Sequence, residues 1–376
     1  QAASTKVHFA VSRTMRTAQG LYEGVDIPGE GTTGLITYMR TDSRHVSQDA
    51  INSARSHIGS SFGPNYLPEK PNYYSSGQRA QEAHEAVRPT DPTRTPESLK
   101  DILSNEQYRL YDLIWKQFIA CQMLPARWNV TEARLIKATD RGEAVFRAVG
   151  QTLIFDGFMK VAGIPKAKDA ILPPLEEAQG LYPVDITPTQ HFTQPPARYT
   201  EAALVKALEA EGIGRPSTYG SIINTIQDRK YVELENRALM PTELGLIVTD
   251  RLVKHFPDIL NVQFTAQMEN DLDRIEDEGL DWVALLKEFY APFHTTVEAA
   301  MEEMTPIWED REASEHICPK CEKPLEYRHS RSGRYLACTT QPECDYTCPV
   351  DDDGNPIHRR EVDVPCPKCG APMMVR

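Results

Sequence analysis

The sequence predicts an α+β protein of several domains, and three observations support this. Apolar residues keep helical spacing over much of the first 125 residues and again after residue 200. Apolar and polar residues alternate on both sides of a turn at residues 140–142, which is typical of a β hairpin. Seven of the eight cysteines follow residue 317. A chain of 376 residues with 40% hydrophobic content can hold two to four such domains.

The first part of the chain has the pattern of a helical domain. Ala2–Glu23 is predicted as an amphipathic helical region. Ser47 is a good N-cap for a helix that runs to Ile58. The clearest helix begins at Thr95-Pro96, because the apolar residues from Leu99 to Ile119 keep helical spacing behind a proline suited to a first turn.

A glycine-rich loop, residues 24–34, leads into a short apolar strand that carries Tyr38 and Arg40. In an extended strand these two side chains project to the same face. A phenol can attack phosphorus and hold it covalently, and a guanidinium offers several donors to phosphoryl oxygens. The structural alternative is a tyrosine packed on the core beside an arginine that reaches water. The spacing alone leaves both interpretations open.

The middle of the chain predicts strands and then irregular backbone. Thr131–Lys137 and Glu143–Gln151 are the two strands of the predicted hairpin. Six prolines between Pro173 and Pro196 exclude long helices and central strands from the segment that follows.

A helix-turn-helix pattern follows the prolines. Thr200 is expected to cap a helix to about Ala210, and a second helix is expected to start at Ser217 or Thr218, beyond a tight glycine turn. Residues 231–240 could form a wing, which would make the unit winged-helix-like. The alternative is an ordinary helical hairpin that binds nothing.

The charge and the apolar pattern limit the possible functions. A net charge of −13 argues against a generally basic nucleic-acid-binding surface, although a local basic groove stays possible. The acidic run 269–281 is expected to be a solvated helix face without chemistry. No apolar run is long enough to span a bilayer and no export leader is found, so we expect a cytoplasmic protein with no membrane partner.

The cysteine spacing predicts a zinc module. Two knuckles, Cys318-x2-Cys321 and Cys338-x5-Cys344, would supply four thiolates. Four thiolates close the coordination of Zn²⁺, so the metal would be structural. Cys348 is the alternative to Cys344 as the fourth ligand. Cys366 and Cys369 would begin a second module that is metal-free or disordered in this chain.

Aromatic and basic residues near the cysteines suit single-stranded nucleic acid. Tyrosines can stack on bases while arginines contact phosphates. The alternative is a module that only folds and docks. The candidate residues, expected to be exposed, are Tyr335, Tyr346, Arg328, Arg331 and Arg334.

The string Gly34–Ser43, GLITYMRTDS, resembles the active-site motif of type IA DNA topoisomerases. Three further strings are similar to other segments of that family and follow in the family's order. They are EAHEAVRPT at 82–90, ARYTEA at 197–202 with GIGRPSTY at 212–219, and FTAQME at 264–269. The resemblance covers essentially the whole chain. The four-cysteine module is similar to the zinc ribbons of bacterial members and favours the topoisomerase I branch.

The resemblance implies roles for individual residues. Tyr38 would cut one DNA strand and form a 5′-phosphotyrosine, Arg40 would stabilise the charge of the transition state, and His84 would help hold the phosphate. The residues implied to contact DNA are Arg88, Arg198, Arg215 and Ser217. The family relaxes negatively supercoiled DNA without ATP, by cleavage of a single strand, strand passage and religation.

The resemblance also implies a missing part. The family's chemistry uses an N-terminal Toprim domain with an acidic cluster for Mg²⁺, and no such signature is found in this sequence. We therefore expect a monomeric fragment that binds single-stranded DNA but is inactive without the Toprim domain. The alternatives are a non-catalytic single-strand-binding module and the topoisomerase portion of reverse gyrase, which lacks support because no helicase motif is found.

Five domains are expected. The strand-rich arch is implied only by the resemblance. In order they are a tyrosine-bearing helical domain at 1–125, the arch and its proline-rich connection at 126–196, a helical DNA-contacting domain at 197–310, a zinc ribbon at 311–350, and the start of a second ribbon at 351–376.

Overall fold

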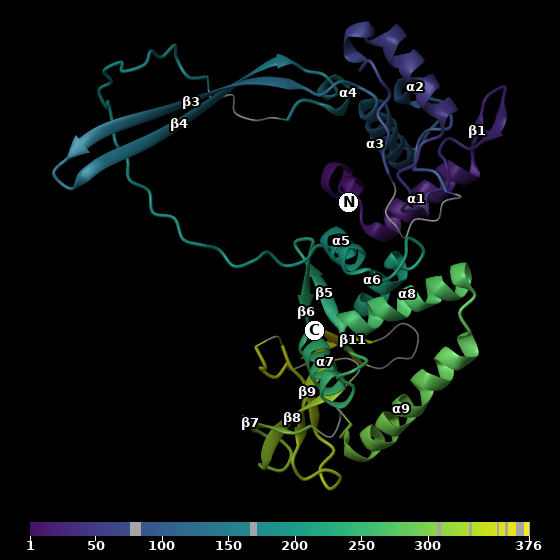
Figure 1. Ribbon diagram of the computed structural model, residues 1–376. Helices are drawn as coiled ribbons and strands as arrows, with labels where there is room; N and C mark the ends of the chain where they lie inside the picture. Colours follow the sequence, from purple (N-terminus) through teal and green to yellow (C-terminus); the bar gives the residue numbers. More distant parts are fainter. Residues whose placement is uncertain are drawn as a thin grey trace. The chain divides into compact units, whose positions relative to one another are not determined.

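The computed structural model describes residues 1–75, 84–165, 171–306, 310–330, 333–351, 353–357, 360–365 and 372–375 (Figure 1). The chain divides into two compact units. The first contains Gln1–Lys206 and Gly214–Asn224, and the second contains Ala207–Ile213 and Thr225–Arg376.

Helices supply most of the main core of the first unit. Among its fully buried side chains are Leu21, Leu35, Ile36 and Tyr111. Burial of each apolar side chain of this size contributes about 1.5–3 kcal/mol. The helices are η1 (Ala3–Val7), α1 (Val11–Glu23), α2 (Gln48–Ser61), η2 (Pro64–Tyr66), η3 (Pro96–Leu99), α3 (Asn105–Cys121) and α4 (Met159–Ala162).

Two predicted helices are each divided in the structure. The N-terminal region breaks at His8, whose φ of 59° ends η1 before α1 begins. The helix predicted from Thr95 is a short 3-10 helix, η3, followed by a separate α3. Ser104 starts α3 with a capping box, since its hydroxyl accepts from the backbone N–H of Gln107, whose side chain accepts in return. Apolar spacing runs across both breaks because the separate helices share one core.

Helix α2 begins at Gln48, as predicted. The region predicted as a glycine-rich loop contains a small hairpin. Strands β1 (Val25–Ile27) and β2 (Gly31–Thr33) pair antiparallel. Gly29 and Gly31 adopt φ values of 84° and 77°, which favour glycine and allow the turn.

The predicted hairpin in the middle of the chain is confirmed and is longer than expected. Strands β3 (Arg127–Thr139) and β4 (Gly142–Phe155) form a two-stranded antiparallel ribbon with Ile136 opposite Val145 (Figure 1). Several apolar side chains on it are exposed, among them Val130, Ile136 and Ile154. Residues 171–200 then form no helix or strand, as their prolines predict.

Helices α5 (Glu201–Glu211) and α6 (Tyr219–Asp228) each belong to both units. Thr200 caps α5 as predicted, accepting from the N–H of Ala203 at 3.2 Å. The hairpin of β5 (Val232–Glu235) and β6 (Ala238–Pro241) occupies the predicted wing. The order of helix, turn, helix and hairpin is therefore present, while a winged-helix unit stays a prediction.

Three helices and a cysteine-rich sheet complete the second unit. The helices are α7 (Glu243–His255), α8 (Val262–Glu278) and α9 (Trp282–Glu303). A four-stranded sheet of order β10-β9-β8-β7 contains β7 (Glu312–Ile317), β8 (Pro324–Ser330), β9 (Gly333–Cys338) and β10 (Thr347–Pro349). Strands β11 (Arg360–Pro365) and β12 (Pro372–Val375) pair separately. None of the helices in the described part of the chain has the length and apolar content needed to cross a membrane.

Candidate active site

Tyr38 follows a short extended segment that is fixed to the core. The N–H of Thr37 donates to the carbonyl of Arg88 at 2.9 Å, and the N–H of Thr90 donates to the carbonyl of Leu35 at 3.0 Å. Between them Ile36 makes an isolated antiparallel bridge to Pro89. The predicted strand is therefore reduced to one bridge, and the backbone bends at Met39 and Arg40.

The side chains around Tyr38 alternate between solvent and core. Tyr38 is 37% exposed, Met39 is buried, and Arg40 is exposed. Ile36, two residues earlier, is fully buried. Alternate side chains are thus buried at Ile36 and exposed at Tyr38 and Arg40. The phenol and the guanidinium are therefore accessible to a ligand.

Two rings contact the Tyr38 ring. The ring centroids of Tyr22 and His84 each lie 5.4 Å from that of Tyr38, with interplanar angles of 68° and 51°. The resemblance predicted His84 as a site residue. The first two residues of its motif, Glu82 and Ala83, lie outside the described residues. The sequence did not indicate Tyr22. Tyr22 lies in the last turn of α1. The N–H of Leu35 donates to the carbonyl of Leu21 in the same turn, at 2.8 Å.

Gly34 allows this close approach of the Tyr38 segment to α1. A Cβ atom on Gly34 would lie 2.8 Å from the carbonyl oxygen of Tyr22. That contact is with backbone, so a larger residue would push the Tyr38 segment away from α1.

We expect Gly34→Ala to lower the free energy of unfolding by about 1–3 kcal/mol, the usual cost of overpacking. The displaced phenol should also lower any reaction of Tyr38 by about tenfold to a hundredfold. Urea denaturation and a cleavage assay measure the two effects. Gly180→Ala is the matched control, because nothing lies within 4 Å of its added Cβ. Equal behaviour of the two variants would contradict the role given to Gly34.

Arg88 is held by an internal ion pair. Its Nη2 and Nε lie 2.6 and 2.7 Å from the Glu85 carboxylate, and its Nη1 donates to the carbonyl of Pro89 at 3.1 Å. The side chain is only 15% exposed. The Arg88 guanidinium can therefore bind a phosphate only if it shares or releases the Glu85 carboxylate. Arg40, in contrast, is exposed. The sequence pattern did not indicate a role for Glu85.

The remaining nominated DNA contacts lie near α5 and α6. Arg198 is exposed in the irregular segment before α5, and Ser217 is exposed in the turn before α6. Arg215 lies in the same turn, where its N–H donates to the Thr218 hydroxyl at 2.8 Å and its Nη1 donates to the carbonyl of Gly214 at 2.8 Å. Thr218 directly precedes the first residue of α6, so it marks the helix start better than Ser217 does.

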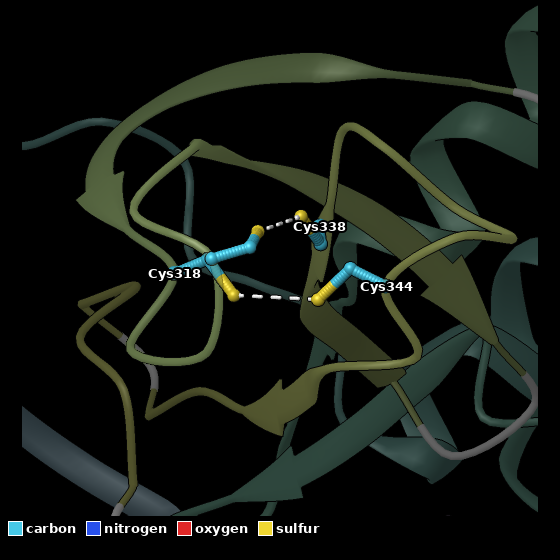
Figure 2. A group of neighbouring side chains, drawn as sticks. Cys318, Cys338 and Cys344 are labelled. Carbon is cyan, nitrogen blue, oxygen red and sulfur yellow. Dashed lines mark hydrogen bonds between the residues drawn. The ribbon is translucent and has the colours of Figure 1, made fainter.

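The four nominated cysteines converge in the second unit. Figure 2 shows the sulfur atoms of Cys318, Cys338 and Cys344 directed into one cluster. Together with Cys321 their sulfur atoms all lie within 4.8 Å of one another, with Cys318 to Cys344 at 3.7 Å and Cys321 to Cys338 at 3.3 Å. Zn–S bonds of about 2.3 Å place tetrahedral sulfur atoms about 3.8 Å apart. The donor set and its spacing therefore fit zinc.

Cys348 is outside this cluster. Its sulfur lies 3.4 and 3.5 Å from the carbonyl oxygens of Pro349 and Ile357. The geometry thus selects Cys344 over Cys348. Cys366 and Cys369 lie outside the described residues.

The surface expected to bind single strands near the cysteines is partly occupied. Tyr335 and Tyr346 are half-buried instead of exposed. Arg328 bonds Glu326 and Gln341, and Arg334 pairs with Glu312 at 2.7 Å while its guanidinium lies 3.7 Å from the Tyr327 ring centroid. Arg331 lies outside the described residues. Spacing could not reveal these internal partners, which leave fewer free cations than predicted.

The cysteine cluster is the one group of three or more potential metal ligands found among the described residues. No other group that could hold the Mg²⁺ implied by the resemblance is found among the described residues.

Comparison with known proteins identifies the family. A family model described as DNA topoisomerase matches residues 1–287, the part that contains Tyr38, His84, Arg88, Arg198 and Arg215. The chain belongs to the type IA DNA topoisomerases. A second model, described as topoisomerase DNA binding C4 zinc finger, matches residues 315–353 and 363–376. Zinc is thus a structural metal of this topoisomerase chain, and the α+β fold with a C-terminal zinc ribbon is confirmed.

The relatives are bacterial. DNA topoisomerase 1 of Vibrio cholerae is 43% identical over 382 aligned residues, which cover 97% of this chain and 41% of that protein. The structure of full-length topoisomerase I from Thermotoga maritima matches with a TM-score of 0.75 and 37% identity, covering 94% of this chain and 56% of that one. The chain therefore spans about two fifths of the length of the Vibrio relative.

Proposed function

We propose that the whole protein relaxes negatively supercoiled DNA without ATP, as a type IA topoisomerase with Tyr38 as its nucleophile. The observation that carries the proposal is the accessible Tyr38 phenol beside the His84 ring, on a segment within the family match. The Tyr38 ring lies against that of His84, and Arg40 follows two residues later, so two potential phosphate ligands accompany the phenol.

The reaction is a reversible transesterification. Tyr38 Oη attacks phosphorus, a Tyr–O–P bond forms, and the bond from phosphorus to the 3′ oxygen breaks. The phenol loses its proton, and the departing 3′ oxygen gains one. Because the 5′-phosphotyrosine keeps the energy of the phosphodiester, the 3′ hydroxyl can reseal the strand after passage of the other strand.

The neighbouring side chains have separable tasks in this scheme. Arg40 is exposed and can place its donors on the phosphoryl oxygens as charge develops. His84 holds the phosphate beside the tyrosine ring. Arg88 binds the phosphate after it releases Glu85, and the ring of Tyr22, on α1, holds the Tyr38 ring in place.

Two metals belong to the proposal. Cys318, Cys321, Cys338 and Cys344 hold the structural zinc, supported by their mutual distances. Mg²⁺ would supply positive charge that eases departure of the 3′ oxygen, and its ligands would come from a Toprim domain outside this chain. We further propose a monomer in the bacterial cytoplasm that acts on chromosomal DNA.

The test is relaxation of a negatively supercoiled plasmid by the whole protein with Mg²⁺ and no ATP, followed by gel separation of topoisomers. Relaxation with a covalent protein–DNA adduct after denaturation supports the proposal. Binding of single strands without relaxation or adduct would instead indicate a non-catalytic binding module.

Arg198 and Arg215 are expected to contact the backbone of single-stranded DNA, with Ser217 in the same turn as Arg215. Each arginine changed to alanine should weaken binding by this chain about threefold to tenfold and reduce the salt slope by about 0.7, since each phosphate contact displaces bound cations. Fluorescence anisotropy over a salt series measures both. Arg134→Ala is the control, because this exposed arginine already bonds Glu132 at 3.3 Å. An unchanged slope in both variants would exclude these contacts.

A further inference from the structure

A hydrogen bond between residues far apart in the sequence joins the start of α1 to the start of α5. The backbone N–H of Val11, the first residue of α1, donates to Glu201 Oε2 at 3.0 Å. Glu201 is the first residue of α5, and 190 positions separate the two partners. Both residues are half-buried, and both belong to the first unit. The bond therefore fixes two helices of this unit to each other.

The Glu201 carboxylate supplies a cap that α1 lacks locally. The N-cap residue Ala10 has no side-chain acceptor, and the first turn of α1 contains Arg13 but no acidic residue. The unsatisfied N–H groups and the positive dipole end of a helix favour a carboxylate at this place. Serine or aspartate at position 10 would meet that need without a distant partner. A carboxylate from α5 meets it and also holds the start of α5 against α1.

Helix α1 leads from this bond to the Tyr38 site. Its last turn contains Tyr22, whose ring centroid lies 5.4 Å from that of Tyr38. Val11 and Tyr22 are 11 positions apart, which is about 16 Å along an α-helix. Ala18 and Leu21 bury one face of α1 in the core, so the helix cannot bend freely between its ends. The start of α1 therefore keeps a fixed distance from the Tyr38 ring.

Helix α5 begins beside a predicted DNA contact. Arg198 is exposed and lies three residues before Glu201, so at most about 11 Å of extended chain separates their Cα atoms. Between them, Thr200 caps α5 by accepting from the N–H of Ala203 at 3.2 Å. The bond at Glu201 therefore limits how far a phosphate held by Arg198 can lie from Tyr38.

We propose that Glu201 is a positioning residue for strand cleavage, an inference that rests on the proposed function. It acts through α1 and α5. With the bond to Val11 in place, a strand held by Arg198 presents one particular phosphodiester to Tyr38. Without the bond, the same strand binds, but its phosphates reach Tyr38 in several registers. The reaction then slows, because a misplacement of about 1 Å at the reacting atoms costs about a hundredfold in rate.

Glu201→Ala in the whole protein, with Mg²⁺ and a single-stranded oligonucleotide, tests this role. At saturating DNA, the rate of adduct formation should fall about tenfold to a hundredfold. Cleavage should also spread over neighbouring positions of the oligonucleotide. Affinity should stay within about threefold, because no phosphate contact is removed. Glu201→Gln should keep the wild-type cleavage positions, since its amide oxygen still accepts from Val11. Sequencing gels and anisotropy measure these quantities.

A double variant separates positioning from simple capping. Glu201→Ala leaves α1 without a cap, which should lower the melting temperature of the first unit by about 2–4 °C. Ala10 already has the extended backbone of an N-cap, with φ −64° and ψ 159°, so adding Ala10→Asp should restore the melting temperature. If Glu201 positions α5, cleavage by the double variant stays slow and spread. Rapid cleavage at the wild-type positions would show that Glu201 only caps α1, and would overturn the proposal.

Glu209→Ala is the matched control, because Glu209 is an exposed glutamate on the same helix. It should cleave like the wild type. A wild-type rate and wild-type cleavage positions in Glu201→Ala would also overturn the positioning role, while the proposed function would stand. If the wild-type protein itself forms no covalent adduct, the proposed function is wrong instead.

Discussion

Tyr38→Phe should abolish plasmid relaxation and covalent DNA capture by the whole protein. The phenol oxygen is the atom that attacks phosphorus in the proposed reaction, and phenylalanine retains the ring without it. We expect a loss of at least about a thousandfold, the scale seen when a nucleophile is removed. Because the ring contacts to Tyr22 and His84 do not use the hydroxyl, single-strand affinity should stay within about threefold. Topoisomer gels, adduct detection and anisotropy measure the three quantities.

The chain provides a matched control for this variant. Tyr22 lies against the same ring, is 40% exposed and carries the same hydroxyl. Tyr22→Phe should retain both relaxation and adduct formation, because its ring alone supports Tyr38. Relaxation that persists in Tyr38→Phe but disappears in Tyr22→Phe would show that the nucleophile had been assigned to the wrong member of the pair.

Cys338→Ser should remove zinc from the chain and unfold the sheet of β7 to β10. Cys338 is fully buried in β9, and its sulfur belongs to the four-cysteine cluster. In small zinc domains the energy of metal binding, about 10–16 kcal/mol, is also folding energy. Metal analysis of protein prepared without chelators should give one zinc in the wild type and none in the variant. Hydrogen exchange should show loss of protection confined to residues 312–349.

Cys348→Ser is the control for the zinc experiment. Cys348 is as buried as several members of the cluster, but its sulfur faces carbonyl oxygens instead. The variant should keep its zinc. A full second equivalent in the wild type would show that Cys366 and Cys369 find ligands that neither the sequence nor the described residues reveal.

The features predicted best are those set by short sequence spacing. The turn at residues 140–142 and the alternation around it determine the ribbon of β3 and β4, because a hairpin is a local structure. The cysteine knuckles likewise predict the cluster, because each pair of cysteines is separated by only two or five residues and can supply two ligands to one metal.

Prediction was weaker wherever distant residues decide the outcome. Tyr22 reaches Tyr38 only because Gly34 lets two backbones approach closely, and no spacing rule reports such a contact. Arg328 looked like a free cation, but pairing of β8 with β9 and the following turn give it Gln341 as a partner. The single helix predicted from Thr95 is wrong for a different reason. Two helices, η3 and α3, pack on one core and so share one apolar periodicity, although Ser104 starts α3 separately.

The ribbon of β3 and β4 has a consequence for solubility. A two-stranded ribbon has two open edges, and exposed apolar residues such as Val130 and Ile136 make it a template for pairing with other chains. Glu132 lies between those two residues on β3. Its carboxylate accepts from Arg147 of β4 at 2.9 Å and from Arg134 of β3 at 3.3 Å. The bond from Arg147, with that from Arg134, lowers the pKa of Glu132, so the group keeps its charge in mildly acidic solution. These fixed charges interrupt the apolar run and act as gatekeepers against aggregation.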